Sequence, residues 1–383
     1  MYCLNKIKFS ILLIAGLAIG FTSCKKDDVD PIPDTLEFAG SETCKTCHST
    51  IHANFMESGH PYKLQKVVGG VQPTIPFAPT ILTPTGYTWN DISYIIGGYG
   101  WKARFIDNKG YVITKVAGSQ YNPGNNTQSV YNGSVATGTE KYTCGVCHTT
   151  GWKSIADGGS PQDGLEGMGG SFYSGGVHCE QCHGMGNIHA VTKLKSDIKV
   201  DKTTDLCANC HQRRKLAGDT KQQTSGGWEM HRNQVEQLMT NKHYTNGSCN
   251  SCHDVHSSTV KDSQAKGNGV TKSCESCHAS IKPANHFNAT CIDCHMPKTA
   301  KNGISFNKYQ GDAPNHNFKI NTSATAKYLT TDATGTWANI DGKGTTLDFV
   351  CYSCHRDADG IGGNKASKKT MLELSNMAKT FHK

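Results

Sequence analysis

The amino-acid sequence predicts a mainly α fold with much irregular structure, in which covalently bound cofactors replace part of the hydrophobic core. Three observations lead to this prediction. Only 36% of the 383 residues are hydrophobic, 41 residues are glycine, and the pattern Cys-x-x-Cys-His occurs eight times. A chain with so few apolar side chains has difficulty filling a core of its own. Large, flat, apolar cofactors would supply the missing core, and the polypeptide would wrap them with loops and short helices.

The eight motifs use sixteen of the eighteen cysteines. Cys-x-x-Cys-His is the attachment sequence of c-type haem, in which two thiols bind the vinyl groups and the histidine is the proximal iron ligand. The motifs are Cys44/Cys47/His48, Cys144/Cys147/His148, Cys179/Cys182/His183, Cys207/Cys210/His211, Cys249/Cys252/His253, Cys274/Cys277/His278, Cys291/Cys294/His295 and Cys351/Cys354/His355. The sequence therefore predicts eight covalently attached haems c.

Three other kinds of site contain paired cysteines. Cys-x-x-Cys occurs in zinc sites and in thioredoxin-like redox sites, and exported proteins use cysteines in disulfide frameworks. Neither zinc nor a disulfide framework requires a histidine directly after every second cysteine, whereas haem attachment does. Haem is thus the favoured interpretation, with zinc and disulfides as its alternatives.

The N-terminus has the pattern of a lipoprotein signal peptide, predicted over residues 1–23. Lys6 and Lys8 precede a short apolar run, which is shorter than the about 20 residues that a membrane-spanning helix needs. The run ends at Cys24, the predicted lipid-attachment site; the alternative is cleavage nearby, which leaves Cys24 as a free thiol. Residues 24–40 are predicted to be a flexible tether. We expect a protein of the cell envelope, lipid-anchored to a membrane on the periplasmic side or at the outer-membrane surface.

The formal charge of +8 does not indicate a nucleic-acid partner. Loss of Lys6 and Lys8 with the signal leaves +6, and eight ferric haems with two ionised propionates contribute −1 each, which brings the total to about −2. The excess of lysine and arginine is better explained as balancing propionates. Arg213 and Arg214 are candidates for such contacts, with a solvated pair as the alternative.

The motifs divide the chain unevenly. Residues 41–143 contain one motif, residues 144–300 contain six, and residues 301–383 contain one. We therefore predict a first haem with a β-containing insertion, a six-haem core, and a C-terminal segment with the eighth haem. These parts are not expected to fold independently, because a single haem beside so few apolar residues would be poorly covered.

A β-hairpin is predicted in the first of these parts. Residues 101–107 and 111–117 are aromatic and β-branched runs joined by an Asn-Lys-Gly turn. The insertion would form a flap over the first haem or a docking face for a partner. Residues 230–240 and 368–380 have helical composition, and the second of these is predicted to be a surface helix outside any site.

Ten of the eighteen histidines remain after the eight proximal ones. Neutral imidazole is a good axial ligand to haem iron, and several spare histidines lie a few residues from a motif. Such short spacings deliver a ligand to a neighbouring haem more readily than to the local one. Methionine is the competing ligand and would raise the reduction potential, but we expect two histidines at most sites.

Seven segments resemble the multihaem cytochromes related to cytochrome c-554 and hydroxylamine oxidoreductase. They are SGH at 58–60, SYIIGGYGWKARF at 93–105, HCEQCHGMGNIH at 178–189, HYTNGSC at 243–249, CHDVH at 252–256, CHMP at 294–297 and NH at 315–316. The resemblance covers roughly residues 40–317 and implies a multihaem cytochrome c fold. It implies His60, His189, His243, His256, His286 and His316 as leading distal ligands. His178 and His231 follow, then His52, with His382 in the tail ranked last.

The resemblance leaves two functions open. The first is electron transfer along closely packed haems, with other redox proteins or a membrane electron-transfer complex as partners. The alternative is a multihaem reductase or oxidoreductase that acts on nitrite, hydroxylamine or an oxidised sulfur compound at one five-coordinate haem. No motif replaces its histidine with lysine, and spare histidines are numerous enough to cap every iron. We therefore expect an electron carrier rather than an enzyme, and no catalytic residue is predicted.

Overall fold

A computed structural model of the chain describes residues 31–213, 221–261, 263–281, 286, 288–339, 341–363 and 366–382. The predicted signal peptide, the lipid-attachment site Cys24 and Arg214 lie outside the described residues. Residues 31–40, the described part of the predicted tether, have no helix or strand.

The helices are short, and each has between four and eight residues. They are α1 (Ser41–Lys45), α2 (Ser49–Phe55), α3 (Gly145–His148), α4 (Cys179–His183), α5 (Asn187–Thr192), α6 (Thr204–His211), α7 (Gln234–Met239), α8 (Lys242–Asn246), α9 (Cys291–His295), α10 (Leu347–Cys351) and α11 (Met371–Ala378). Single 3₁₀ turns are η1 (Pro61–Lys63), η2 (Trp89–Asp91), η3 (Gln162–Gly164), η4 (Lys195–Asp197), η5 (Cys249–Ser251) and η6 (Cys274–Ser276). Segments 230–240 and 368–380 contain α7 and α11 respectively.

Each Cys-x-x-Cys-His motif begins on or directly beside one of these short elements: α1, α3, α4, α6, η5, η6, α9 and α10. A helical turn suits the motif because residues at i, i+3 and i+4 lie on one face of a helix. In α6, for example, that face carries Cys207, Cys210 and His211. Local structure thus directs both thiols and the imidazole of a motif to the same side.

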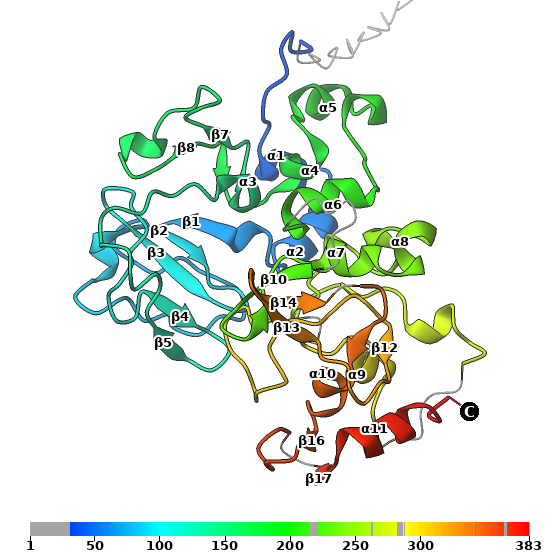
Figure 1. The fold of residues 1–383 in the computed structure, drawn as a ribbon. Coiled ribbons are helices and arrows are strands. Elements are labelled where there is room, and N and C mark those ends of the chain that lie inside the picture. The colour runs from blue at the N-terminus through cyan, green and yellow to red at the C-terminus, as the bar shows by residue number, and fades with distance from the viewer. Residues whose placement is uncertain are drawn as a thin grey trace, which may run out of the picture.

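A five-stranded antiparallel sheet forms one side of the molecule (Figure 1). Its strands are β1 (Leu64–Lys66), β2 (Ile92–Gly97), β3 (Ala103–Asp107), β4 (Gln120–Asn122) and β5 (Thr127–Ser129), in sequence order across the sheet. Alternate residues of the central pair point to opposite faces, with Ile95 opposite Phe105 and Tyr94 opposite Ile106. All four side chains are buried, in two separate hydrophobic clusters. Both faces of the sheet are therefore covered.

The predicted hairpin is present only in part. Gly110 donates its backbone N–H to the Asp107 carbonyl at 2.9 Å, and Ile106 forms a single antiparallel bridge with Val112. Residues 111–117 form no strand, although they lie within the described range. The main partners of β3 are β2 and β4, so the insertion is a sheet rather than an isolated hairpin.

The C-terminal half contains a second, four-stranded sheet in the order β11 (Trp228–Glu229), β10 (Lys221–Ser225), β14 (Gly335–Asn339) and β13 (Leu329–Asp332). Short two-stranded pairs complete the β structure. They are β6 (Thr149–Thr150) with β9 (Ser174–Gly175), β7 (Lys153–Ser154) with β8 (Gly170–Ser171), β12 (Ile320–Asn321) with β15 (Thr345–Thr346) and β16 (His355–Arg356) with β17 (Ala366–Lys368).

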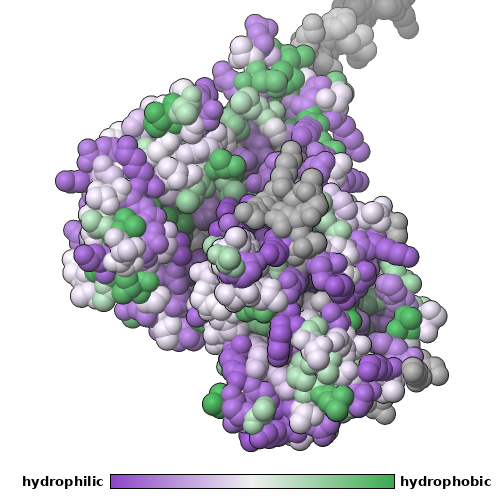
Figure 2. Space-filling view, in the orientation of Figure 1, coloured by the Kyte–Doolittle hydropathy of each residue, from purple (hydrophilic) through white to green (hydrophobic). Residues whose placement is uncertain are grey.

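The predicted proportion of helix is too high. The described residues contain both short helices and short strands, which are joined by irregular structure. The hydrophobic core is divided into small clusters. The face shown in Figure 2 is largely polar, with hydrophobic residues scattered over it. The expectation of little regular structure is borne out by this arrangement.

Candidate haem-binding site

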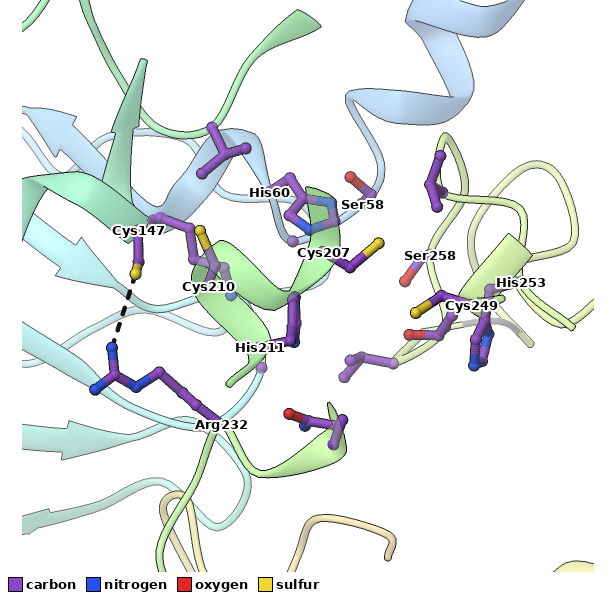
Figure 3. A pocket seen from close by; sticks show the side chains of 18 of the residues that line it. Ser58, His60, Cys147, Cys207, Cys210, His211, Arg232, Cys249, His253 and Ser258 are labelled. Carbon is purple, nitrogen blue, oxygen red and sulfur yellow. Dashed lines mark hydrogen bonds between the residues drawn. The ribbon is translucent and has the colours of Figure 1, made fainter. Parts of the chain in front are cut away.

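One connected cavity of about 3460 Å³ runs through the structure, and residues of all eight motifs line it. Protein interiors are normally packed as closely as organic crystals, with few voids larger than a water molecule. A cavity of this volume therefore marks space for large groups. The motifs face this common space, as α6 with Cys207, Cys210 and His211 illustrates (Figure 3).

Cysteines of different motifs are neighbours around the cavity. The thiols of Cys44 and Cys179 interact, as do those of Cys147 and Cys210, Cys207 and Cys249, and Cys274 and Cys291. Electrostatic contacts also join Cys182 to Cys207, Cys252 to Cys277, and Cys294 to Cys351. Each motif thus has a neighbouring motif. The contacts run from the first motif through the third to the eighth, and the second motif joins this series at the fourth. All sixteen cysteines in the described residues are free of disulfides.

Seven of the eight motif histidines face a second histidine, and in six of these pairs both rings line the cavity. The ring-centre distances are 6.4 Å for His48–His189, 6.3 Å for His211–His60, 6.2 Å for His183–His256, 6.3 Å for His253–His316, 5.9 Å for His278–His243, 5.9 Å for His295–His382 and 5.8 Å for His355–His286. A metal–imidazole bond is about 2 Å long and the ring centre lies about 1 Å further out, so two imidazoles on opposite sides of one metal ion have centres about 6 Å apart. The seven pairs have this separation.

Each facing histidine belongs to a different part of the chain from the motif that it faces. His189 follows the third motif and faces the first, and His60 follows the first motif and faces the fourth. His256 follows the fifth motif and faces the third. The chain is therefore interleaved, and a ligand pair in this arrangement would cross-link distant segments.

Backbone carbonyls orient five of the proximal rings. The Nδ1–H groups of His148, His183, His253, His295 and His355 donate to the carbonyls of Lys63, Lys199, Gly269, Phe318 and Ser367, at 3.1, 2.7, 3.2, 2.6 and 3.0 Å. A carbonyl can only accept, so Nδ1 carries the proton and Nε2 presents a lone pair. Metal-bound histidines are held in this way by a hydrogen bond at the other ring nitrogen.

Burial keeps several of these imidazoles neutral. It lowers the pKa of His60 to about 3 and those of His148 and His316 to about 4. A histidine must be neutral to bind a metal ion. These rings therefore meet the requirement at neutral pH, and the arrangement fits covalently bound haem.

His148 is the exception among the proximal histidines. The structure describes all eighteen histidines, and none of their rings is paired with His148 as in the seven pairs. Its motif lies instead beside cationic side chains: Arg104 and Arg232 act electrostatically on Cys144, and Arg232 Nη1 lies 3.7 Å from Cys147 Sγ (Figure 3).

The cationic side chains come from several elements. Lys102 and Arg104 lie at the start of β3, Arg213 follows α6, and Arg232 precedes α7; all four line the cavity. The Arg104 guanidinium stacks 3.5 Å from the centre of the Tyr131 ring and is held by Gln120. The sheet therefore positions positive charge beside the second motif.

Two family models match parts of the chain. Residues 114–184 match the family described as cytochrome c554 and c-prime, and residues 241–283 match the doubled CXXCH motif. These two stretches of the chain are similar to multihaem c-type cytochromes. The first match includes the second and third motifs, and the second match includes the fifth and sixth. Residues of all four motifs line the cavity.

Two solved structures share the fold of this chain. The outer cell wall cytochrome OcwA is 17% identical, with a TM-score of 0.55 over 90% of this chain and 86% of that one. The octaheme sulfite reductase MccA of Wolinella succinogenes is 18% identical, with a TM-score of 0.59 over 92% of this chain and 68% of that one. No curated protein sequence is significantly similar to this chain.

The structure places the other predicted ligands away from the proximal rings. His178 uses both ring nitrogens within the protein: Nδ1 lies 3.2 Å from Ser41 Oγ, and Nε2 lies 3.0 Å from the Gly175 carbonyl. His52 lies 3.6 Å from Glu42. His231 lies among the cationic side chains, where burial, with Lys102 and Arg232 adding to it, lowers its pKa to about 3. None of the three is brought face to face with a proximal histidine in the described structure.

The structure adds two features to what the sequence predicts. Segment 368–380 is predicted to be a surface helix outside any site; His382, which follows it, faces His295 in the structure. The β insertion is predicted to form a flap over the first haem or a docking face for a partner; in the structure Arg104 lies beside Cys144 of the second motif, and Lys102 lies near Arg104 and Arg232. Both residues belong to the segment at 93–105 that resembles other multihaem cytochromes, which could have pointed to them.

Arg213 lines the cavity, as expected for a propionate contact, while its backbone N–H donates to Glu236 and its Nε to Gln223. No helix in the described residues has the length and apolar character needed to cross a bilayer.

Proposed function

We propose that the protein is an octahaem cytochrome that transfers electrons along a continuous series of haems, most of them held by two histidines. The eight Cys-x-x-Cys-His motifs would hold the haems. His60, His189, His243, His256, His286 and His316 would be the distal ligands at six of them. When bound, haem iron supplies a one-electron couple whose potential depends on its axial ligands, burial and hydrogen bonds.

The facing histidine pairs carry this proposal. Two imidazoles about 6 Å apart suit a six-coordinate iron, which has no open position for a substrate. The motifs line one cavity, and cysteines of neighbouring motifs contact one another. Cofactors held so close together suit electron transfer from one end of the protein to the other.

We place the protein in the cell envelope, with Cys24 as a lipid anchor to a membrane. Its partners would be other redox proteins or a membrane electron-transfer complex. The similar structure OcwA is an outer cell wall cytochrome by name, which agrees with this location. Haem c is attached outside the cytoplasm, and the pattern at residues 1–23 agrees with export.

A reaction at the second motif is a second candidate function, and one observation favours it. No histidine is paired with His148, and Lys102, Arg104, Arg213 and Arg232 line the cavity near it. An iron held by His148 would keep its other side open. Positive charges suit small anions, such as nitrite or an oxidised sulfur compound. The similar structure MccA is an octaheme sulfite reductase by name.

The spin state of the oxidised protein tests the two functions. We expect electron paramagnetic resonance and resonance Raman spectra to show seven low-spin haems and one high-spin haem, because only His148 lacks a facing histidine. Mass spectrometry should show eight haems per chain. A spectrum of eight low-spin haems would overturn the candidate reaction and leave electron transfer, whereas several high-spin haems would contradict the proposed ligand pairs.

Replacement of single distal histidines tests the pairs. His60→Ala and His189→Ala should each raise the high-spin population by one haem in eight, because each removes one axial ligand. His178→Asn is a matched control, since its ring nitrogens face Ser41 and Gly175 rather than a proximal histidine. If His60→Ala stays as low-spin as the parent protein while His178→Asn gains a high-spin signal, the assignment is reversed.

A further inference from the structure

We propose that His382 is the distal ligand of the haem at Cys291/Cys294/His295, and that the C-terminal segment 366–382 clamps the last two haems. The proposal rests on the proposed function in one respect, because it requires haems at the seventh and eighth motifs. It adds an axial ligand that the sequence ranked last, and it makes the end of the chain part of the electron-transfer series.

The first support is the geometry at the seventh motif. The rings of His295 and His382 are 5.9 Å apart and inclined by 28°. His295 Nδ1–H donates to the Phe318 carbonyl at 2.6 Å, so its Nε2 carries the free lone pair. His382 also lines the cavity, although it is the last described residue. The pair therefore matches the other six in separation, and both of its histidines line the cavity.

The second support is that helix α11 is fixed upstream of His382. Its N-terminus has a capping box, in which Thr370 N–H donates to Glu373 at 2.7 Å and Thr370 Oγ accepts from Glu373 N–H at 3.3 Å. Leu374 is 3% exposed and packs with Leu347 of α10. Ser375 Oγ donates to the Thr322 carbonyl at 2.6 Å. These contacts hold α11 in place, so they also set the position from which the chain continues to His382.

The same segment contacts both histidines at the eighth motif. The Ser367 carbonyl accepts from His355 Nδ1 at 3.0 Å, where β17 pairs with β16. At the other end of the segment, the Phe381 ring lies 5.0 Å from the ring of His286, which faces His355 at 5.8 Å. One segment thus orients the proximal ring, packs against the distal ring, and supplies the distal ring of the neighbouring site.

The two sites lie beside one another. Cys351 of the eighth motif and Cys294 of the seventh interact electrostatically, and α10 packs close to α9. The remaining five histidine pairs are formed by residues up to His316, all upstream of the segment. Changes at the C-terminus should therefore affect the seventh and eighth haems and leave the other haems in their parent state.

The test uses the full-length protein with His382→Gly. We expect the high-spin population to rise by one haem in eight, because the seventh haem loses its distal ligand, and added imidazole should restore the low-spin state. Lys379→Ala is the matched control: Lys379 is exposed at the end of α11 and should leave the spectrum unchanged. An unchanged spectrum of His382→Gly, at full haem content, would overturn the proposal.

A second variant keeps a ligand at the position. His382→Met should remain low-spin and raise the reduction potential of one haem, because methionine ligation raises the potential. If the potentials of His382→Met equal those of the parent protein, His382 is not a ligand. Haem content separates this result from failure of the proposed function: fewer than eight haems in the parent protein would refute the octahaem assignment itself.

Discussion

Replacement of Glu229 by leucine is expected to lower the free energy of unfolding by about 3–5 kcal/mol. Glu229 is 1% exposed. Its carboxylate accepts hydrogen bonds from Gln237 at 2.9 Å, and from Thr299 and Tyr328 at 2.7 Å each. Loss of the carboxylate leaves three buried donors without this acceptor, and each such donor costs about 1–3 kcal/mol. The total is below the simple sum because some donors can find another partner.

The hydrogen-bond network around Glu229 also reaches a proposed haem ligand. Gln237 Oε1 accepts from the His316 backbone N–H at 2.8 Å, and Asn241 donates to the His316 carbonyl at 3.0 Å. His316 faces His253 across the cavity. Displacement of Gln237 in Glu229→Leu should therefore disturb the fifth haem before the others.

Urea denaturation, followed by circular dichroism in the haem absorption band, measures the change. Glu229→Gln keeps the size of the side chain and part of the hydrogen bonding, so it should cost less than Glu229→Leu. Glu166→Leu is the surface control, since Glu166 is exposed and its change should stay within about 0.5 kcal/mol. A loss for Glu229→Leu no larger than that of Glu166→Leu would show that the buried network does not stabilise the fold.

The short-range features of the molecule were predictable from the sequence. Cys-x-x-Cys-His spans one helical turn, and each motif is found at a short helix or 3₁₀ turn. A short spacing between a spare histidine and a motif also predicted that this histidine would face a different motif from the one beside it in the sequence. His189 and His256 face the first and third motifs in the structure, not the motifs that they follow.

The long-range features were not predictable. Residues 101–107 and 111–117 have the composition of a hairpin, but β3 pairs with β2 and β4, because burial of Ile95 against Phe105 favours the wider sheet. β-propensity describes how well a residue fits a half-buried pleated surface and does not specify its partner. The helix content is also lower than predicted. Each motif needs only one helical turn, and the flanking residues do not extend these turns into longer helices.

The position of the C-terminus shows the same limit. Composition predicted helix α11, and its capping box supports that prediction. The position of α11 on the protein depends on the burial of Leu374 and on the hydrogen bond from Ser375 to Thr322, which is remote in sequence. Periodicity within 368–380 contains no information on either contact, so His382 was ranked last among the spare histidines although it faces His295.

Anion binding at the second motif is expected to weaken as the pH rises through about 8. Lys102 lines the cavity with Arg104, Arg213 and Arg232. Burial, and then repulsion by Arg104, lowers the pKa of Lys102 to about 8. The side chain is therefore protonated below this pH, where it attracts an anion, and becomes neutral above it. The neighbouring His231, with a pKa of about 3, is neutral throughout this range and adds no dependence of its own.

Azide is a suitable probe, because it is an anion in this range and binds an open haem iron with a change in absorption. We expect Lys102→Met to weaken azide binding at pH 7 by tenfold to about a hundredfold, the value of one charge-assisted hydrogen bond of about 1.5–3 kcal/mol. The variant should also lose the pH dependence near 8, since the group that titrates is gone.

Lys109→Met, at an exposed position of the same sheet region, should match the parent protein. Equal azide affinities at pH 7 and 9 in the parent protein would show that Lys102 does not act on the ligand. If Lys102→Met alone abolishes the decline, the positive charge at the start of β3 sets which molecules reach the haem held by His148.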